Sequence, residues 1–200
     1  MAGSRSPDAS ETFSPEEEAI ILETARRMVV RIDPAGQGGF NAVEVPDFME
    51  KLLIFLLDTG AHISVLGGLR SSNLHERTRE GVTVRYLTWK RPKNRKTIDC
   101  PVSTRLDPWI AEWLDAPRPR SRSRYNQLLK DLEAELRAHG RLIHLNPHRF
   151  RHRALARWHK DFHRPVADVC RIGGTTVDTL VKYIQDPVDR IARDLKREGW

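Results

Sequence analysis

The stretch His148-Arg149-Phe150-Arg151-His152, followed by Thr175-Thr176-Val177-Asp178-Thr179-Leu180-Val181-Lys182-Tyr183, decides how this chain is interpreted. It places a histidine, an arginine and a tyrosine in one basic region that is predicted to be helical. The planar fork of arginine can hold a phosphate through two parallel hydrogen bonds. A tyrosine oxygen is a nucleophile when neighbouring groups activate it. The pattern therefore indicates a phosphate site beside a reactive tyrosine.

The charge of the chain is concentrated in one part of it. The net charge is +7, but residues 1–50 carry a net charge of −6 and residues 51–200 one of +13. Such a surplus favours a polyanionic partner, because lysine and arginine laid against phosphates release condensed counterions. We expect double-stranded DNA as the partner, although a basic protein without a nucleic acid partner remains an alternative. A tyrosine beside a phosphate that is held by cations can break and rejoin a DNA strand without a metal or a cofactor.

The size of the chain predicts one compact domain. Two hundred residues, of which 39% are hydrophobic, can bury one core. We expect residues 1–12 to be disordered and 13–200 to form the domain. No apolar run approaches the length of a membrane span, and the N-terminus lacks a signal-peptide core, which predicts a cytoplasmic protein. Cys100 and Cys170 are interpreted as buried small apolar residues, since their spacing is not that of a metal site.

Start and stop signals predict mostly helices. Ser14-Pro15-Glu16-Glu17 has the residues of a capped helix start, and that helix is expected to continue to about Arg31. A second helix begins near Pro46, includes the apolar run to Leu57 and stops at Gly60. A helix that ends at Gly140 is predicted with one apolar face, formed by Tyr125, Leu128, Leu129, Leu132 and Leu136. The other predicted helices are a short one from Ile63 to Leu66 or Leu69, then 107–114, 148–162, 165–172, 175–183 and 187–197.

One hairpin is predicted among these helices. Alternating residues predict a strand at 82–87 and a partner at 96–102. The tip between them, 90–95, is rich in cations and suits contact with phosphates, although a solvated turn is the alternative. A second basic segment, 117–124, is predicted to be a flexible linker. The side chains that we expect to contact DNA are Arg91, Lys93, Arg95, Lys96, Arg118, Arg120, Arg149 and Arg153.

Three boxes in this order resemble those of the tyrosine recombinases, or phage-type integrases. Thr59 to Arg70 is similar to the first box of the family, usually Thr-Gly-x-Arg-x-Ser-Glu-Leu-x-x-Leu. His148-x-x-Arg151-His152 resembles the second, His-x-Leu-Arg-His. Ile172-Gly173-Gly174 stands where the family has Leu-Gly-His, with Tyr183 nine residues beyond it. The resemblance covers about residues 13–185 and implies the catalytic-domain fold of that family, mainly α-helical with a small antiparallel sheet.

The resemblance also implies roles for individual side chains. Tyr183 would attack the phosphodiester and form a 3′-phosphotyrosyl intermediate, and Arg151 would hold the phosphate. Lys90 would protonate the departing 5′ oxygen, and His148 would donate to the phosphate or assist proton transfer. His62 would replace the first arginine of the family as a fifth candidate. Each has a structural alternative, since Tyr183 could pack on the core and His62 could be a packed or capping histidine.

The chain departs from the pattern of the family at three positions. His62 stands where the first arginine belongs, Val65 replaces a glutamate, and Gly174 replaces the usual third-box histidine or tryptophan. Losing one donor to a transition state typically costs about 3–4 kcal/mol. The resemblance therefore leaves two functions open: a recombinase or integrase that cleaves and rejoins DNA, or a weakened or inactive DNA-binding regulator that competes or pairs with a full integrase.

Three further expectations concern metal, domains and partners. His144, His148, His152, His159 and His163 include i, i+4 pairs that suit a metallohydrolase, but Arg149 stands where HExxH needs its glutamate, so we expect no metal. Relatives usually carry a separate DNA-clamping domain before the catalytic one, and only about twelve residues precede the first predicted helix here. The last helix is expected to pack on its own domain or to mediate self-association or pairing with a full-length recombinase.

Overall fold

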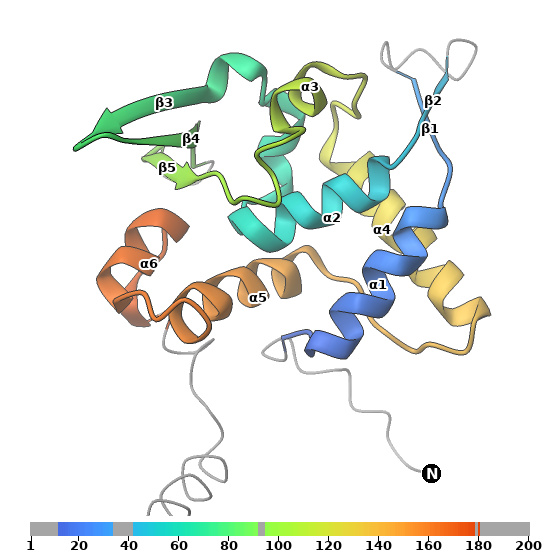
Figure 1. Cartoon of the computed structure of the whole chain (residues 1–200). Coiled ribbons are helices and arrows are strands. Elements are labelled where there is room, and N and C mark those ends of the chain that lie inside the picture. The colour runs from blue at the N-terminus through green and yellow to red at the C-terminus, as the bar shows by residue number, and fades with distance from the viewer. Residues whose placement is uncertain (1–11, 34–41, 92–94, 179, 181–200) are drawn as a thin grey trace, which may run out of the picture.

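The computed structural model describes residues 12–33, 42–91, 95–178 and 180, and they form a helical body with two small antiparallel sheets (Figure 1). In chain order the elements are α1 (Pro15–Arg27), β1 (Val30–Ile32), β2 (Val43–Val45), α2 (Phe48–Thr59), the 3-10 helices η1 (Ile63–Gly68) and η2 (Ser71–Asn73), β3 (Leu74–Arg79), β4 (Val82–Lys90), β5 (Thr97–Pro101), α3 (Ile110–Asp115), α4 (Arg122–Ala138), α5 (Pro147–Lys160) and α6 (Val166–Gly173).

Helix α1 begins as predicted and ends four residues early. The Ser14 hydroxyl accepts a hydrogen bond from the Glu17 amide, and the Glu17 carboxylate accepts one from the Ser14 amide. The predicted end at Arg31 was wrong, because Val30–Ile32 pair with Val43–Val45 as an antiparallel two-stranded sheet. Burial explains the change, since Val30 and Ile32 reach the core from one face of an extended strand.

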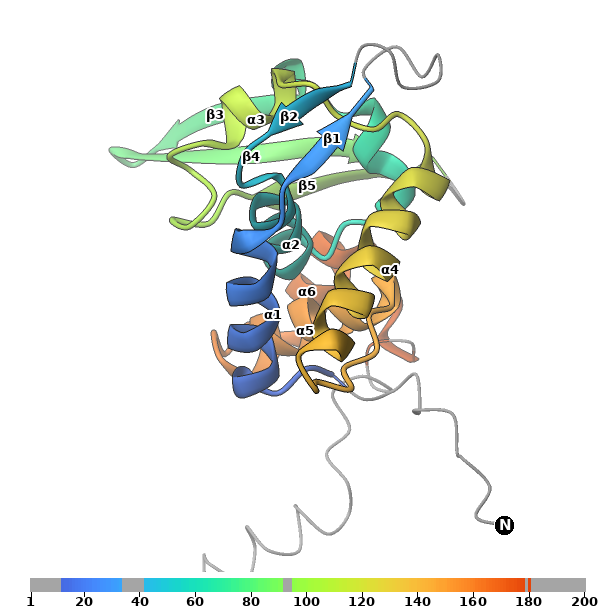
Figure 2. The same cartoon turned by 90° about the vertical axis from the view of Figure 1, so that its right-hand side faces the viewer.

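Helix α2, which the sequence predicted, lies at the centre of the helical body (Figure 1). Apolar residues surround almost its whole circumference, which is typical of a helix that is covered on all sides. Phe48, Leu52 and Phe55 are completely buried, and α1 and α5 pack against this helix. Figure 2 shows α1 and α4 flanking α2, with β1 and β2 above their upper ends. Helix α2 therefore joins α1 and α5 in one core.

The larger sheet has three strands in the order β3-β4-β5. The pairing of β4 with β5 confirms the predicted hairpin, and Lys90 lies opposite Thr97 next to its tip. Strand β3 had not been predicted, because its sequence, Leu-His-Glu-Arg-Thr-Arg, lacks the alternation of a half-buried strand. Leu87, Ile98 and Cys100 face the core from β4 and β5, and α6 packs against β5. The sheet thus brings the hairpin tip toward α6.

The basic segment before α4 is more ordered than predicted. Helix α4 begins at Arg122, inside the predicted linker, with the Ser121 hydroxyl accepting from the Arg124 amide. Its buried face confirms the predicted apolar stripe: Tyr125, Leu128, Leu129, Leu132 and Leu136. Gly67 makes a close approach to this segment, because a Cβ atom there would lie 2.2 Å from the Arg120 carbonyl oxygen. The segment is therefore packed against η1.

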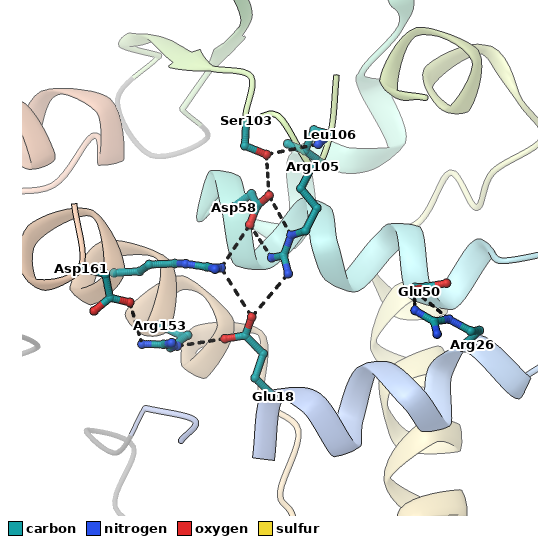
Figure 3. Close-up of polar contacts among 10 residues, drawn as sticks. Glu18, Arg26, Glu50, Asp58, Ser103, Arg105, Leu106, Arg153 and Asp161 are labelled. Atoms are coloured by element: carbon teal, nitrogen blue, oxygen red, sulfur yellow. Dashed lines mark hydrogen bonds and ion pairs between the residues drawn. The ribbon is translucent and has the colours of Figure 1, made fainter. Parts of the chain in front are cut away.

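An ion-pair network joins α1, α2 and α5 (Figure 3). Asp58 accepts hydrogen bonds from the Ser103 hydroxyl at 2.6 Å and from Arg105 at 2.5 and 3.2 Å. Glu18 accepts from Arg153 at 3.0 Å. Arg157 contacts both carboxylates, at 3.4 and 3.5 Å. These charges are paired across three elements, which satisfies carboxylates that the fold has removed from water.

The remaining expectations on the fold have mixed outcomes. Cys100 is buried as expected, and Cys170 is partly buried beside Leu155 and Val169. Within the described residues, no helix is both long enough and apolar enough to cross a bilayer. The expectations for residues 1–11, for the end of the 175–183 helix and for the 187–197 helix lie outside the part that the structure describes.

Candidate phosphate site

Arg151 connects the three sequence boxes. It is buried on α5, a helix that begins where the Asn146 side chain accepts from the His148 amide and Pro147 occupies the first turn. The Arg151 Nη1 donates to the Gly60 carbonyl at 2.6 Å, and its Nη2 donates to the Gly173 carbonyl. Segments more than 90 and 20 residues away in sequence thus meet at one guanidinium. The three boxes, which are separate in the sequence, therefore come together at one site.

A cavity of about 790 Å³ opens beside Arg151. Its wall includes His62 from the turn after α2 and His148 from the first turn of α5. The rings of His62 and His148 lie 6.5 Å apart between centroids, and those of His148 and His152 lie 6.3 Å apart. Three predicted site residues, His62, His148 and Arg151, therefore share one cavity of a size that binds ligands.

Helix α4 contributes cations to this cavity that sequence reasoning missed. Arg122, Lys130 and Arg137 line it, together with Glu133. Glu133 accepts hydrogen bonds from the Leu145 amide at 3.0 Å and contacts His144 and Arg137. The helical spacing of these residues offers a signal, because positions 122, 126, 130, 133 and 137 form one polar stripe beside the leucine face. Polar faces of helices are usually only solvated, so the sequence does not distinguish this stripe as part of a site.

The environment of His62 keeps its imidazole neutral. Burial, followed by the positive charges of Arg151, Arg91, His148 and Arg122, lowers the pKa of His62 to about 4. A cation there would lose water and face like charges. At neutral pH, His62 is therefore not the charged substitute for arginine that the sequence had suggested.

The hairpin tip lies next to the third box. A Cβ atom on Gly174 would lie 3.6 Å from Cδ of Arg91 and 2.5 Å from Cδ1 of Ile98. The Arg91 amide donates to the Lys96 carbonyl at 2.8 Å, which closes the tip. Lys90, Arg95 and Lys96 are exposed around it, and Lys93 lies outside the described residues. The tip therefore places several exposed cations at one edge of the site.

Gly174 leaves little room for a side chain. It ends α6 with a φ of +58°, in the left-handed region that other residues adopt at a cost. The contact with Ile98 blocks the direction that a Cβ atom would take. Both the backbone conformation at position 174 and the neighbouring Ile98 side chain therefore favour glycine over the histidine or tryptophan that is usual in the third box.

Three arginines that we had expected on DNA are used inside the fold. Arg118 is buried and donates to the Leu66, Leu69 and Leu114 carbonyls. The other two lie on α5: Arg149 is buried, with its guanidinium 4.3 Å from the centroid of the Phe13 ring, and Arg153 pairs with Glu18. Burial and these partners oppose direct DNA contact, whereas Arg120 is exposed.

The tyrosine of the sequence pattern is not placed by the structure. Tyr183 lies outside the described residues, as does the C-terminal segment beyond it. The described chain leads toward it as far as Leu180, which is buried with Leu155 and Val169. Among the side chains that the structure describes, no group of three or more histidine, cysteine or carboxylate residues is placed to hold a metal ion.

Comparison with known proteins gives a likeness of fold. No family model matches the chain, and no curated protein matches its sequence. Among solved structures, a XerA recombinase aligns with a TM-score of 0.62 and 14% identity over 95% of this chain. A XerH site-specific recombinase bound to its difH substrate aligns at 0.56 and 15% over 90%. A Tn1549 transposon integrase in complex with circular intermediate DNA aligns at 0.57 and 13% over 98%.

These matches identify the fold that the sequence predicted. The chain has the fold of the tyrosine recombinase catalytic domain, mainly α-helical with small antiparallel sheets. It spans 65%, 52% and 68% of the lengths of those three structures.

Proposed function

We propose that this chain binds double-stranded DNA through the cavity beside Arg151 and the basic tip between β4 and β5. The observation that carries the proposal is the meeting of the three boxes at Arg151, next to cations contributed by α4 and by the hairpin. Such a surface suits a backbone phosphate, whose contacts depend on charge and geometry rather than on base sequence. The recombinase fold supports the same partner.

We further propose that Tyr183 cleaves and rejoins a DNA strand through a 3′-phosphotyrosyl intermediate. The attack passes through a state with extra charge on the phosphate oxygens, which Arg151 and His148 would stabilise. Lys90 would give its proton to the departing 5′ oxygen. The step conserves the number of phosphodiester-type bonds, because the O–P bond to the tyrosine forms as the bond to the 5′ oxygen breaks. It needs neither metal nor cofactor.

A second function is supported by the same site. His62 is neutral at physiological pH, Gly174 supplies no donor, and two donors of Arg151 are engaged with backbone carbonyls. A chain with this weakened grip would bind DNA without cutting it. It would then act as a regulator that competes or pairs with a complete recombinase, and the segment beyond Tyr183 is where we would look for pairing.

A nicked suicide substrate separates the two functions. The duplex carries a nick a few nucleotides 3′ of the expected cleavage position, so that the short piece with the new 5′ hydroxyl diffuses away and the protein stays attached to the 3′ phosphate. Cleavage predicts a covalent adduct on denaturing electrophoresis that is absent from Tyr183→Phe. Because the cognate site is not known, the substrate is a library of nicked duplexes whose attached strands are sequenced.

Restoring the first-box cation is the companion test. His62→Arg should increase adduct formation if the missing charge limits cleavage, whereas His62→Gln should not. Salt-sensitive DNA binding without adduct, for the wild-type chain and for His62→Arg, would support the regulator. Gly174→His is a poor partner for this test, because φ and Ile98 oppose a side chain at that position.

A further inference from the structure

We infer that engagement of a DNA phosphate in the cavity is coupled to proton uptake by His62. The inference rests on the proposed DNA-binding function and deepens it, since it assigns this side chain a conditional charge. A binding site with arginine at this position would carry a permanent charge, because arginine stays protonated. Here the charge appears only when an anion arrives.

The geometry around His62 is the first support. The imidazole lies in the cavity wall, with its ring 6.5 Å from that of His148 at an interplanar angle of 82°. The groups that act on it come from three other segments: Arg151 and His148 on α5, Arg122 on α4, and Arg91 at the hairpin tip. Every one of these groups is cationic or can become so, and they converge on the place where a phosphate would bind.

The nearby acid does not compensate this positive field. Glu133 is the carboxylate in the cavity wall, and it already accepts from the Leu145 amide and contacts His144 and Arg137. Its pKa is lowered: burial opposes the shift, but the hydrogen bonds from Leu145 and His144 and the charges of His144 and Arg137 outweigh it. Glu133 is thus an anion with its own partners in the cavity wall, and Lys130 and Arg137, which also line the cavity, add positive charge.

A bound phosphodiester reverses the balance at His62. Its negative charge would offset the field of the arginines and raise the pKa of the imidazole from its low value in the free protein. The ring then takes up a proton and gains a second N–H donor. By linkage, a group that is protonated only in the complex makes binding stronger as the pH falls. The window extends from the free-state pKa, about 4, up to the raised pKa in the complex.

The measurement is DNA affinity as a function of pH at constant ionic strength. The probe is a fluorescently labelled duplex of arbitrary sequence, because phosphate contacts do not require a cognate site. We expect the affinity of the wild-type chain to rise as the pH is lowered from about 8 to about 5, with His62 contributing up to about tenfold per pH unit. His62→Gln and His62→Arg should both lack this contribution, and His62→Arg should bind more tightly at the alkaline end.

Control variants distinguish this coupling from the general effect of histidine charge. His75→Gln, on the exposed strand β3, should keep the slope of the wild-type chain. Equal slopes in the wild-type chain and in both His62 variants would overturn the inference and leave DNA binding intact. Absence of DNA binding by all of them at every pH would reject the proposed function as well.

A second measurement uses the wild-type chain alone and does not depend on the folding of any variant. The ring proton resonances of His62 in nuclear magnetic resonance spectra report its protonation directly, with and without the duplex. We expect a titration near pH 4 in the free protein and a higher midpoint in the complex. A free-state midpoint near the ordinary value for histidine, or the same midpoint in both states, would overturn the inference.

Discussion

At the scale of single residues, the site depends on glycines as much as on cations. Gly60 and Gly173 present the carbonyls that receive the Arg151 guanidinium, and Gly174 ends α6 with a positive φ. A guanidinium that bonds to two distant carbonyls holds the boxes at a fixed separation. Gly174, which departs from the family pattern, therefore has a structural role at the end of α6.

A glycine substitution tests this role. Gly174→Ala should lower the free energy of unfolding by about 2–3 kcal/mol, because a left-handed alanine costs about 1–2 kcal/mol and Ile98 must also move. Gly81→Ala is the matched control, since Gly81 has φ +76° and nothing within 4 Å of a Cβ atom. Urea denaturation should show the larger loss for Gly174→Ala. Equal losses would mean that the Ile98 contact is unimportant.

At the scale of elements, the ion-pair network decides how α5 sits against α1 and α2. The side chains of Asp58 and Glu18 are 7% and 9% exposed, so removing one carboxylate leaves the arginines around it with only one acidic partner each in a poorly solvated place. The two elements that carry these acids are joined to α5 by Arg153 and Arg157 (Figure 3). Because α5 also carries His148 and Arg151, the network supports the site from the opposite face of that helix.

Removal of the Asp58 charge should therefore weaken the fold. We expect Asp58→Asn to lower the free energy of unfolding by about 2–4 kcal/mol, less than a fully buried pair because Arg105 and Arg157 are partly exposed. Glu23→Gln breaks the exposed pair with Arg27 and should change it by less than about 0.5 kcal/mol. Denaturation curves of both variants provide the measurement. A near-neutral Asp58→Asn would show that the network does not position α5.

At the scale of the whole molecule, the positive charge of residues 51–200 is divided between interior and surface. Arg118, Arg149 and Arg153 are used for packing, whereas Lys130 and the cations of the hairpin tip remain exposed at the site. Net charge alone thus overstates the number of side chains available to a phosphate backbone. The surface that counts is formed by α4, the first turn of α5 and the tip between β4 and β5.

A salt titration of DNA binding tests this division. Lys130→Ala should weaken binding to any duplex and reduce the slope of log affinity against log salt by about one, as expected for a lost phosphate contact. Arg27→Ala removes one charge from α1, where the side chain pairs with Glu23, and should leave the slope unchanged. The same loss from both variants would indicate that only net charge matters.

The sequence predicted the elements whose signals are local. The capped start of α1, the apolar run of α2 and the leucine face of α4 each follow from spacing within one helix, and all three are confirmed. Strands β1, β2 and β3 were missed because short strands are defined by partners elsewhere in the chain. The α4 cations were missed because a polar helix face is usually only solvated, and the cavity that they line is formed together with α5 and the turn after α2.

By itself, the sequence determined the fold and the identity of the three boxes, because residue order and spacing are properties of the chain. Only the tertiary structure decided which cations face the cavity. Arg149 and Arg151 are two residues apart on one helix, yet Arg149 stacks over Phe13 and Arg151 reaches Gly60 and Gly173. The charge state of His62 was decided in the same way, since it depends on burial and on arginines contributed by three other segments. The burial and the electrostatic environment of a side chain depend on the groups that pack around it in the folded chain. They cannot be predicted from how far apart residues are in the sequence.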